Sequence, residues 1–436
     1  MELGTITRNP KVRGVQSIQS AWYRYYPCFS EDFAKEALCS ASLKRGDWVL
    51  DPWNGSGTTT SSAVALGFNA HGYDLNPVMV LVAKARCLEV SEFPSLRLLA
   101  AEISRQSRSS CDPHPDDPLS LWLCPRSVAA IRGIEVAVQR LLIDNRKFAT
   151  LNDRGVNEAS DLAAFFYVAL FRTVKQLFQP FLTSNPTWVK RPRSFRSRLR
   201  PSGLAIRAAF RNNLLEMIPR QLPKASSGVR GEKIIGIASS ESLPLPDGSA
   251  NCVLGSPPYC TRIDYAVATS PELALLGYAH ENGFDKLRRE LIGTSTVPPV
   301  VPEVSQNLGK ACLKFLGALS SHASKASSTY YYKNHVQYFV SIGKSLSEIR
   351  RVLKVGGRCI LVAQDSYYKD LHNDLPTILT EMAAIRGLYL SSRSDFVLSR
   401  TMAGVNPGAQ EYRESFSAVE SVLIFEAKRP THRSNR

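Results

Sequence analysis

The chain has 436 residues, 44% of them hydrophobic, which is enough for one large domain with an insertion or for two domains. Lysine and arginine total 54 against 38 acidic residues, and the net charge of +16 suits a polyanionic partner, a solvated basic surface being the alternative. We expect a soluble cytoplasmic protein without membrane partner, because no apolar run reaches the roughly 18 residues of a membrane span and no secretory signal opens the chain. We also expect no metal, because the nine cysteines lack metal-ligand spacing.

The first recognisable unit in the chain, residues 40–90, predicts strand, loop, helix, strand and helix in that order. The apolar run Trp48–Leu50 is the first strand, and Thr58–Leu66 is a helix that ends at a glycine. Asn69–Tyr73 is the second strand. Pro77 then opens another helix, where its fixed φ suits the first turn.

A glycine-rich loop, Asp51–Thr59, joins the first strand to the first helix. Gly55 and Gly57 allow positive φ and a close approach of the backbone to a ligand. The loop has no lysine after its second glycine and does not fit GxGxxG, which argues against a phosphate-binding loop. Asp74 ends the next strand, where a carboxylate can accept hydrogen bonds from two ribose hydroxyls. The structural alternative is a turn followed by a helix-capping aspartate.

This segment, DPWNGSGTT followed by GYDLNP, resembles the cofactor motifs DPFxGSGTT and GxDxxP of the amino-directed DNA methyltransferases, with Trp53 in place of phenylalanine. The stretch before it is similar to the family's cofactor-side helix. The resemblance implies an α/β, Rossmann-like class I methyltransferase fold that binds S-adenosyl-L-methionine. It also implies that Asp51, Gly55 and Gly57 shape the methionine pocket and that Asp74 holds the ribose. The residues assigned to the cofactor are Asp51, Pro52, Asn54, Gly55, Ser56, Gly57, Thr58, Asp74 and Asn76.

Further along the chain, strands are expected at Lys233–Ala238, Asn251–Gly255, Arg358–Ala363 and Ser421–Glu426, with a helix over Tyr338–Leu353. Strands that alternate with helices predict a parallel sheet covered by helices on both faces. Ligands bind at the carboxyl ends of the strands in such a sheet.

Inserted segments split this sheet. Residues 91–230 are expected to be mainly helical and are a candidate DNA-binding region, and a second insertion of mixed character covers about 262–335. Residues 1–90 and 231–430 are then the two parts of the methyltransferase domain, the first with the cofactor motifs. An aromatic stripe in the helical insertion is expected to be core: Phe165, Phe166, Tyr167 and Phe171.

The tetrapeptide Ser256-Pro257-Pro258-Tyr259 follows the strand at Asn251–Gly255. Two prolines cannot continue a central strand, so they end it at the carboxyl edge, beside the cofactor loop. Methylating an aromatic amine is difficult because the ring delocalises the nitrogen lone pair. The Ser256 hydroxyl and the Pro257 carbonyl can accept both N–H protons and turn that lone pair toward the sulfonium methyl. Tyr259 offers a flat face to a flipped base, and we assign catalysis to all four residues.

SPPY resembles the catalytic motif of this family, in the form commonest in cytosine-N4 enzymes and shared by some adenine-N6 enzymes. The resemblance covers about 20–90 and 230–427, with two departures. The acidic residue expected after the third strand is missing, and Ser239, Ser240 or Glu241 stands in its place. The cofactor loop also precedes the catalytic motif, the reverse of the commonest order with SPPY, although circular permutation is known in the family.

A basic segment, residues 190–200, holds six cations and no acidic residue. Binding to phosphates is its predicted role, and a solvated basic linker is the alternative. Arg262 directly follows the catalytic motif and is expected to contact DNA or to pair near Asp264. The residues assigned to DNA are Lys190, Arg191, Arg193, Arg196, Arg198, Arg200 and Arg262.

Together these patterns predict a methyltransferase that acts on the exocyclic amine of a flipped base in double-stranded DNA, with sequence specificity and with cytosine N4 preferred. Adenine N6 is the first alternative. An RNA amino-methyltransferase and a non-catalytic nucleic-acid-binding protein are the others. A cognate restriction endonuclease is a candidate partner, and the nucleoid of a bacterium or archaeon is the expected location.

Overall fold

A computed structural model gives the fold over residues 6–12, 17–24, 29–108, 114–143, 151, 153–183, 189–219, 229–260, 263–279, 283–297, 300–324, 326–398 and 418–428. Across these ranges the strands form a seven-stranded sheet of order β3-β2-β1-β4-β5-β9-β8 and a small β6-β7 pair. The strands are β1 (Trp48–Asp51), β2 (Asn69–Asp74), β3 (Lys233–Ile237), β4 (Ala250–Gly255), β5 (Leu353–Gln364), β6 (Ser366–Tyr368), β7 (Leu371–Asn373), β8 (Leu388–Leu398) and β9 (Ala418–Ala427).

The first five strands of the large sheet are parallel, and β9 runs antiparallel to both of its neighbours, β5 and β8. This confirms the predicted fold class, because parallel strands alternate with helices around one sheet. Every strand predicted from the sequence is present. Strands β6, β7 and β8 were not predicted. Along β8 Leu388 is buried and the other side chains are partly or fully exposed, so this edge strand lacks the apolar run of the buried strands.

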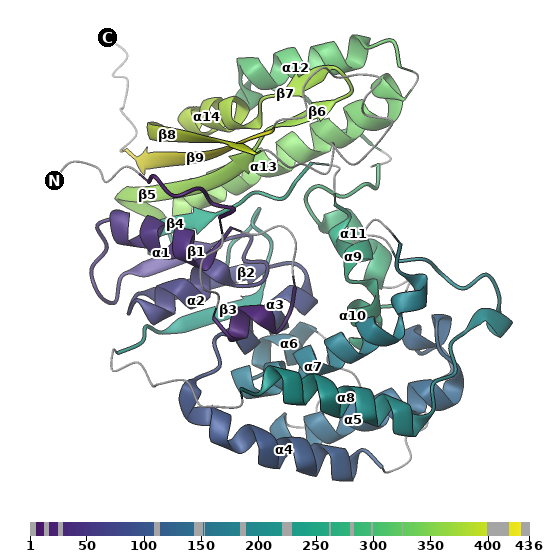
Figure 1. The fold of residues 1–436 in the computed structure, drawn as a ribbon. Helices are drawn as coiled ribbons and strands as arrows, with labels where there is room; N and C mark the ends of the chain where they lie inside the picture. Colours follow the sequence, from purple (N-terminus) through teal and green to yellow (C-terminus); the bar gives the residue numbers. More distant parts are fainter. Residues whose placement is uncertain are drawn as a thin grey trace, which may run out of the picture.

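Helices cover both faces of the large sheet (Figure 1). On one face lie α1 (Glu31–Ser40) and α2 (Thr58–Ala65), and on the other α12 (Lys310–Ser321), α13 (Tyr332–Val352) and α14 (Leu375–Ile385). Local sequence explains these helices: Ser30 caps α1 by accepting from the backbone N–H of Phe33, and two acidic residues occupy its first turn. The helix predicted to begin at Tyr338 begins six residues earlier, at Tyr332.

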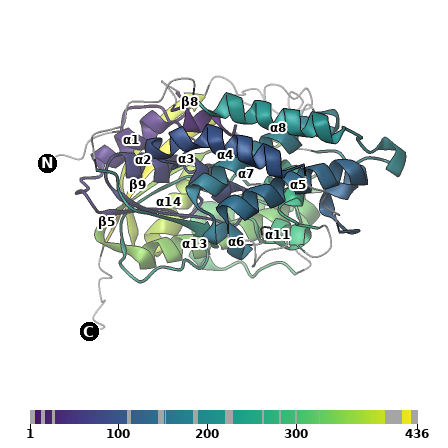
Figure 2. The same cartoon turned by 90° about the horizontal axis from the view of Figure 1, so that it is seen from below.

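A group of helices lies to one side of the sheet, where Figures 1 and 2 show them packed together. They pack against α3 (Pro77–Arg86), which lies between them and the sheet and is buried from Pro77 to Ala85. The four aromatic side chains predicted as core, all on α7, are fully buried. The group comprises α4 (Phe93–Gln106), α5 (Pro125–Leu142), α6 (Asp153–Glu158), α7 (Asp161–Leu177) and α8 (Gly203–Met217).

Three short helices follow the catalytic tetrapeptide and contact this helical group: α9 (Tyr265–Ala268), α10 (Ser270–Leu275) and α11 (Asp285–Glu290). A buried guanidinium fastens α10 to α5. Arg132 Nε donates to Asp117 Oδ2 at 2.7 Å, and its Nη2 donates to the Ala274 carbonyl at 3.2 Å. The helical group is therefore tied directly to the chain that leaves the catalytic motif.

Two further properties of the described ranges concern membranes and metals. None of the helices there has the length and apolar character needed to cross a bilayer. The same ranges contain no group of three or more histidine, cysteine, aspartate or glutamate side chains arranged to hold a metal ion.

Candidate active site

A cleft opens at the carboxyl edge of the sheet. It brings together two motifs that lie some two hundred residues apart in the sequence. Gly57, the one predicted cofactor residue outside the lining, has φ +80° and directly precedes α2. A Cβ there would lie 2.8 Å from the Ala83 Cβ. The predicted residues in the lining are Asp51, Pro52, Asn54, Gly55, Ser56, Thr58, Asp74, Asn76, Ser256, Pro257, Pro258 and Tyr259.

The register of the sheet explains why the two motifs lie side by side. Parallel β1 and β4 are neighbours, with Val49 opposite Cys252 and Leu50 opposite Val253. The loops that leave their carboxyl ends therefore start side by side. The roles of these residues in binding and catalysis stay predictions, but their proximity follows from the topology.

Asp74 holds the cofactor loop in shape. Its Oδ2 accepts the backbone N–H of Gly55 at 2.9 Å, and its Oδ1 accepts that of Asn76 at 2.8 Å. The Asn76 side chain caps α3 and donates from Nδ2 to Thr269 Oγ1 at 2.9 Å. One carboxylate thus connects the glycine loop to the start of α3, and Asn76 connects that start to the end of α9.

Two carboxyl groups dominate the electrostatics of the cleft. Burial raises the pKa of Asp51 to about 7, although it accepts hydrogen bonds from Trp53 and Thr59, and the nearby charge of Asp74 adds to the increase. Burial likewise raises the pKa of Asp74 to about 6. Neither group forms an ion pair with any cation in the described ranges. A cationic ligand fits such a site, and S-adenosylmethionine carries both an ammonium and a sulfonium.

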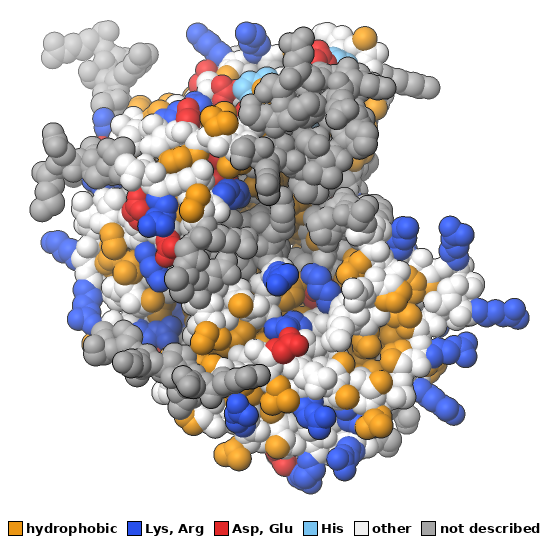
Figure 3. All heavy atoms as spheres, in the orientation of Figure 1, with side chains coloured by type: hydrophobic (Ala, Val, Ile, Leu, Met, Phe, Trp, Pro, Cys, Tyr) orange, Lys and Arg blue, Asp and Glu red, His pale blue; other side chains and the backbone are white. Residues whose placement is uncertain are grey.

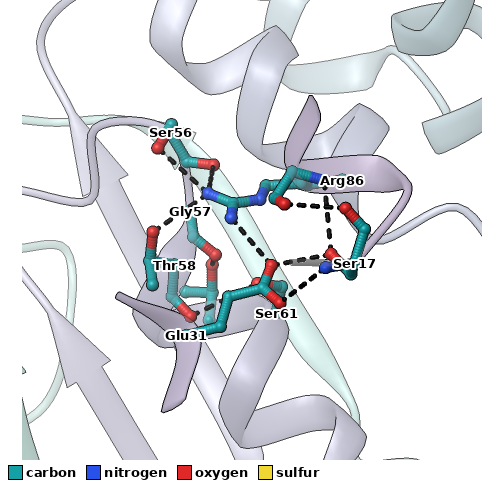
Figure 4. Close-up of polar contacts among 9 residues, drawn as sticks. Ser17, Glu31, Ser56, Gly57, Thr58, Ser61 and Arg86 are labelled. Atoms are coloured by element: carbon teal, nitrogen blue, oxygen red, sulfur yellow. Dashed lines mark hydrogen bonds and ion pairs between the residues drawn. The ribbon is translucent and has the colours of Figure 1, made fainter. Parts of the chain in front are cut away.

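Arg86, at the end of α3, supports the same loop and was not predicted (Figure 4). Its Nη1 donates to the Ser56 carbonyl at 3.1 Å, to Ser56 Oγ at 3.0 Å and to Thr58 Oγ1 at 2.9 Å. Its Nη2 donates to Glu31 Oε1 at 2.8 Å, and the same oxygen accepts from Ser17 Oγ at 2.7 Å. A basic residue in a last helical turn is ordinary, so no sequence signal pointed to this role.

The tetrapeptide is held by two neighbouring elements. The Ser256 hydroxyl donates to the Val362 carbonyl of β5 at 2.8 Å, which leaves the lone pairs of its oxygen available as acceptors. The Tyr338 hydroxyl of α13 donates to the Pro258 carbonyl at 2.9 Å. Pro257 stands between the two residues that make these bonds, so the position of its carbonyl is fixed from both sides.

Tyr259 is surrounded by polar partners from distant parts of the chain. Its backbone N–H donates to the Tyr265 hydroxyl at 2.9 Å, and its own hydroxyl lies 3.4 Å from Gln364 Oε1. Lys11 Nζ donates to the Tyr259 hydroxyl at 3.3 Å and pairs with buried Glu420 at 3.2 Å. Burial opposes the charge of Lys11, but Tyr259 and Glu420 outweigh it, so the pKa of Lys11 is raised.

The three residues near the missing acid separate in the structure. Ser240 lines the cleft, and its Oγ accepts from Trp53 Nε1 at 2.9 Å. Ser239 and Glu241 line a neighbouring recess instead. Of the three, Ser240 alone lines the cleft that the two motifs form.

The predicted DNA contacts between residues 190 and 200 lie apart from this cleft. Residues 189–200 run beside the start of α5, where Leu199 N donates to the Trp122 carbonyl at 2.9 Å. Phe195 is 75% exposed, with the guanidinium of Arg198 4.1 Å from its ring centroid. Lys190, Arg191 and Arg198 line another, larger hollow. Figure 3 shows lysine and arginine side chains that project from the outer edge on this side of the molecule. Arg262 lies outside the described residues.

Residues 4–85 match the sequence family N6_N4_Mtase, described as DNA methylase. Over this segment the chain is similar to the amino-directed DNA methyltransferases. The resemblance to this family is thereby confirmed, and with it S-adenosylmethionine as the cofactor. The match does not distinguish cytosine-N4 from adenine-N6 enzymes.

Two curated relatives are named as type II methyltransferases. The chain is 41% identical over 63 residues to type II methyltransferase M.BsoBI of Geobacillus stearothermophilus, which is 14% of this chain and 12% of the relative. It is 21% identical over 389 residues to type II methyltransferase M.AvaI of Nostoc sp. (strain PCC 7120 / SAG 25.82 / UTEX 2576), covering 84% of this chain and 78% of that one. Among solved structures, a geranyl diphosphate methyltransferase in complex with GPP and sinefungin is 8% identical, with a TM-score of 0.32 over 91% of this chain and 76% of that chain.

Replacing Arg86 with lysine should weaken binding of S-adenosylmethionine by about tenfold, because lysine keeps the charge near Glu31 but cannot make the same fork of hydrogen bonds to Ser56 and Thr58. Calorimetric titration measures the affinity. The matched control is Arg105→Lys, since Arg105 is exposed and pairs with Glu102 on α4, away from the loop. Equal affinities for Arg86→Lys and the wild type would remove Arg86 from the support of the loop.

Binding of S-adenosylmethionine should weaken as the pH falls from 8 to 5.5. The Asp51 and Asp74 carboxyl groups, with pKa values of about 7 and about 6, take up protons in that range and lose the charge that attracts the cation. The affinity should fall by about tenfold per pH unit once one group titrates. Because these folded-state pKa values exceed the unfolded ones, the ligand-free protein should conversely gain stability over the same fall in pH.

Titrations at several pH values test this, with Asp51→Asn as the comparison. That variant should lose the part of the dependence near pH 7 and keep the part near pH 6. A pH-independent affinity for the wild type would contradict the assignment of either carboxylate to the cofactor.

Proposed function

We propose that this protein transfers the methyl group of S-adenosylmethionine to the exocyclic amine of a base in DNA, preferentially to N4 of cytosine. The observation that carries the proposal is one cleft that holds two buried carboxyl groups without cation partners, in the described ranges, beside the acceptor atoms of Ser256-Pro257. A cationic methyl donor and an amine are the two reactants that such a cleft suits.

The carboxyl groups hold the donor. Each oxygen of Asp74 accepts one backbone N–H and keeps a second lone pair, so this carboxylate can also accept from ribose hydroxyls. Asp51 supplies negative charge for the ammonium and sulfonium. When bound, S-adenosylmethionine supplies an electrophilic methyl carbon. The fixed glycine loop pre-organises these contacts, so that little ordering cost is left for the binding step.

Ser256 and Pro257 act on the amine. Ser256 donates its hydroxyl proton to the Val362 carbonyl, and its oxygen therefore faces the amine as an acceptor. That oxygen and the Pro257 carbonyl accept the two N–H groups, which draws the nitrogen toward a tetrahedral shape and frees its lone pair for in-line attack. The contribution is one of position and electrostatics and needs no covalent enzyme intermediate.

Tyr259 contributes a face on which the flipped base can stack. Its hydroxyl and backbone are held from outside the tetrapeptide, by Lys11, Gln364 and Tyr265. Such restraint suits a stacking platform, because the ring does not have to be ordered when the base arrives.

DNA is favoured over RNA by the family match and by relatives named as type II methyltransferases. The same names favour double-stranded DNA recognised with sequence specificity, and a cognate restriction endonuclease as partner. The serine at position 256 favours cytosine N4, because the resemblance associates SPPY mainly with cytosine-N4 enzymes. Adenine N6 is the second candidate, since its amine can donate to the same two acceptors.

Incubation of DNA with the enzyme and isotope-labelled S-adenosylmethionine should place the label in N4-methylcytosine, as seen by mass spectrometry of the nucleosides. Ser256→Ala is the comparison: it should lower the rate by at least about a hundredfold with little change in cofactor affinity, because its acceptor matters most as the nitrogen becomes tetrahedral. Label in N6-methyladenine would transfer the preference to adenine. Label in RNA alone would overturn the proposal of a DNA substrate.

Replacing Arg193, Arg196, Arg198 and Arg200 with glutamine should weaken DNA binding to a similar degree for all sequences. The logarithmic salt dependence should flatten by roughly 0.9 for each phosphate that the segment no longer neutralises. Anisotropy titrations across a range of salt concentrations measure both effects. Arg97→Gln and Arg140→Gln, on helices of the same group, serve as controls for net charge. An unchanged slope would leave the segment a solvated linker.

A further inference from the structure

The recess lined by Ser239 and Glu241 adjoins the active cleft, between the start of α13 and the chain that follows α11. The two cavities share Leu75, Leu291 and Ile292 in their linings. Tyr338 lines the recess and donates its hydroxyl to the Pro258 carbonyl of the catalytic tetrapeptide. The recess therefore lies directly beside the site proposed above.

The chain after α11 packs directly on the catalytic backbone. Gly293 lines the recess with φ +82°, and a Cβ built there would lie 2.2 Å from the Tyr259 carbonyl oxygen. Only glycine permits so close an approach. At Gly293 the lining of the recess is thus in backbone contact with the tetrapeptide.

The floor of the recess carries amide atoms that have no partner among the described residues. Asn334 is 3% exposed, and neither its Nδ2 nor its Oδ1 makes a hydrogen bond there. Gln337 lies three residues later on α13, on the same face of the helix, and its Oε1 is also buried and unpaired. A buried amide without partners destabilises a fold, so these three atoms together indicate a ligand that supplies the missing hydrogen bonds.

The chemistry of that ligand follows from the atoms. An asparagine amide offers a donor and an acceptor side by side, which is the complement of an amine next to a ring nitrogen. Adenine and cytosine both present that edge. The apolar side chains of Leu75, Leu291 and Ile292 suit the faces of a flat ring, while Glu241 and Lys344 in the same lining pair with each other at 3.2 Å.

Resting on the proposed function, we propose that Asn334 and Gln337 form a subsite that binds the amine and adjacent ring nitrogen of a base. Two sources can supply this edge: the adenine of S-adenosylmethionine or the flipped target base. In the first case these two residues select the cofactor, and in the second they select the target base. Neither residue belongs to the two sequence motifs.

The experiment compares Asn334→Leu and Gln337→Leu with the wild type. Calorimetry with S-adenosylhomocysteine and with adenosine measures the cofactor source, and KM for DNA in the methylation assay measures the base source. Each variant should either lower the affinity for S-adenosylhomocysteine and adenosine about tenfold or raise the KM for DNA about tenfold. Asn307→Leu, an exposed asparagine in the short helix Gln306–Leu308, is the matched control and should change neither.

Melting temperature separates this role from a structural one. If the Asn334 amide has no partner in the ligand-free protein, Asn334→Leu should raise the melting temperature of that state while binding weakens. A lower melting temperature would show that the fold itself uses the amide, and unchanged binding in both variants would show that no base contacts it. Either result overturns the subsite. A wild-type enzyme that binds adenosine but labels no DNA would instead count against the proposed function, because the calorimetric arm needs no methyl transfer.

Discussion

The parallel pairing of β1 with β4 is the constraint on which the active site depends. It sets Leu50 opposite Val253, so the loops that follow the two strands leave the sheet at neighbouring points. A shift of one residue would turn every side chain of one strand to the opposite face and would separate the glycine loop from Ser256. The buried side chains of both strands, packed between helices on either face, hold this register in place.

The cleft and the recess beside it are built at a cost to stability. Within the described part of the chain, Asp51 and Asp74 are buried without cations, and amide atoms of Asn334 and Gln337 are buried without hydrogen-bond partners. Groups of this kind oppose folding unless a ligand satisfies them. Around them the protein is well supported: Arg86 fastens the glycine loop, and Tyr338 and Tyr265 fasten the tetrapeptide. The polar groups left for a ligand are thus distinct from those that hold the fold, although both line the same edge of the sheet.

Local sequence determined much of this protein. The buried strands were predictable because apolar runs between turn residues have few other solutions, and the helix starts follow from Ser30 and Pro77. Asp51–Thr59, Asp74 and Ser256–Tyr259 could be singled out because each motif is contiguous and ends a strand. Topology then placed them at one edge. The polar edge strand β8 escaped prediction because one of its faces is open to solvent.

Only the tertiary structure decided which distant residues support these motifs. Lys11 donates a hydrogen bond to Tyr259, 248 positions away in the sequence, and Arg86 donates to Ser56, 30 positions away. Asn334 can be recognised as a candidate only because α13 places it in the lining of a cavity. None of these residues belongs to a repeated or contiguous pattern, because a hydrogen bond between separate elements imposes no spacing on the sequence. The sequence therefore determined the chemistry at the ends of the strands, while the three-dimensional fold determined what holds that chemistry in place.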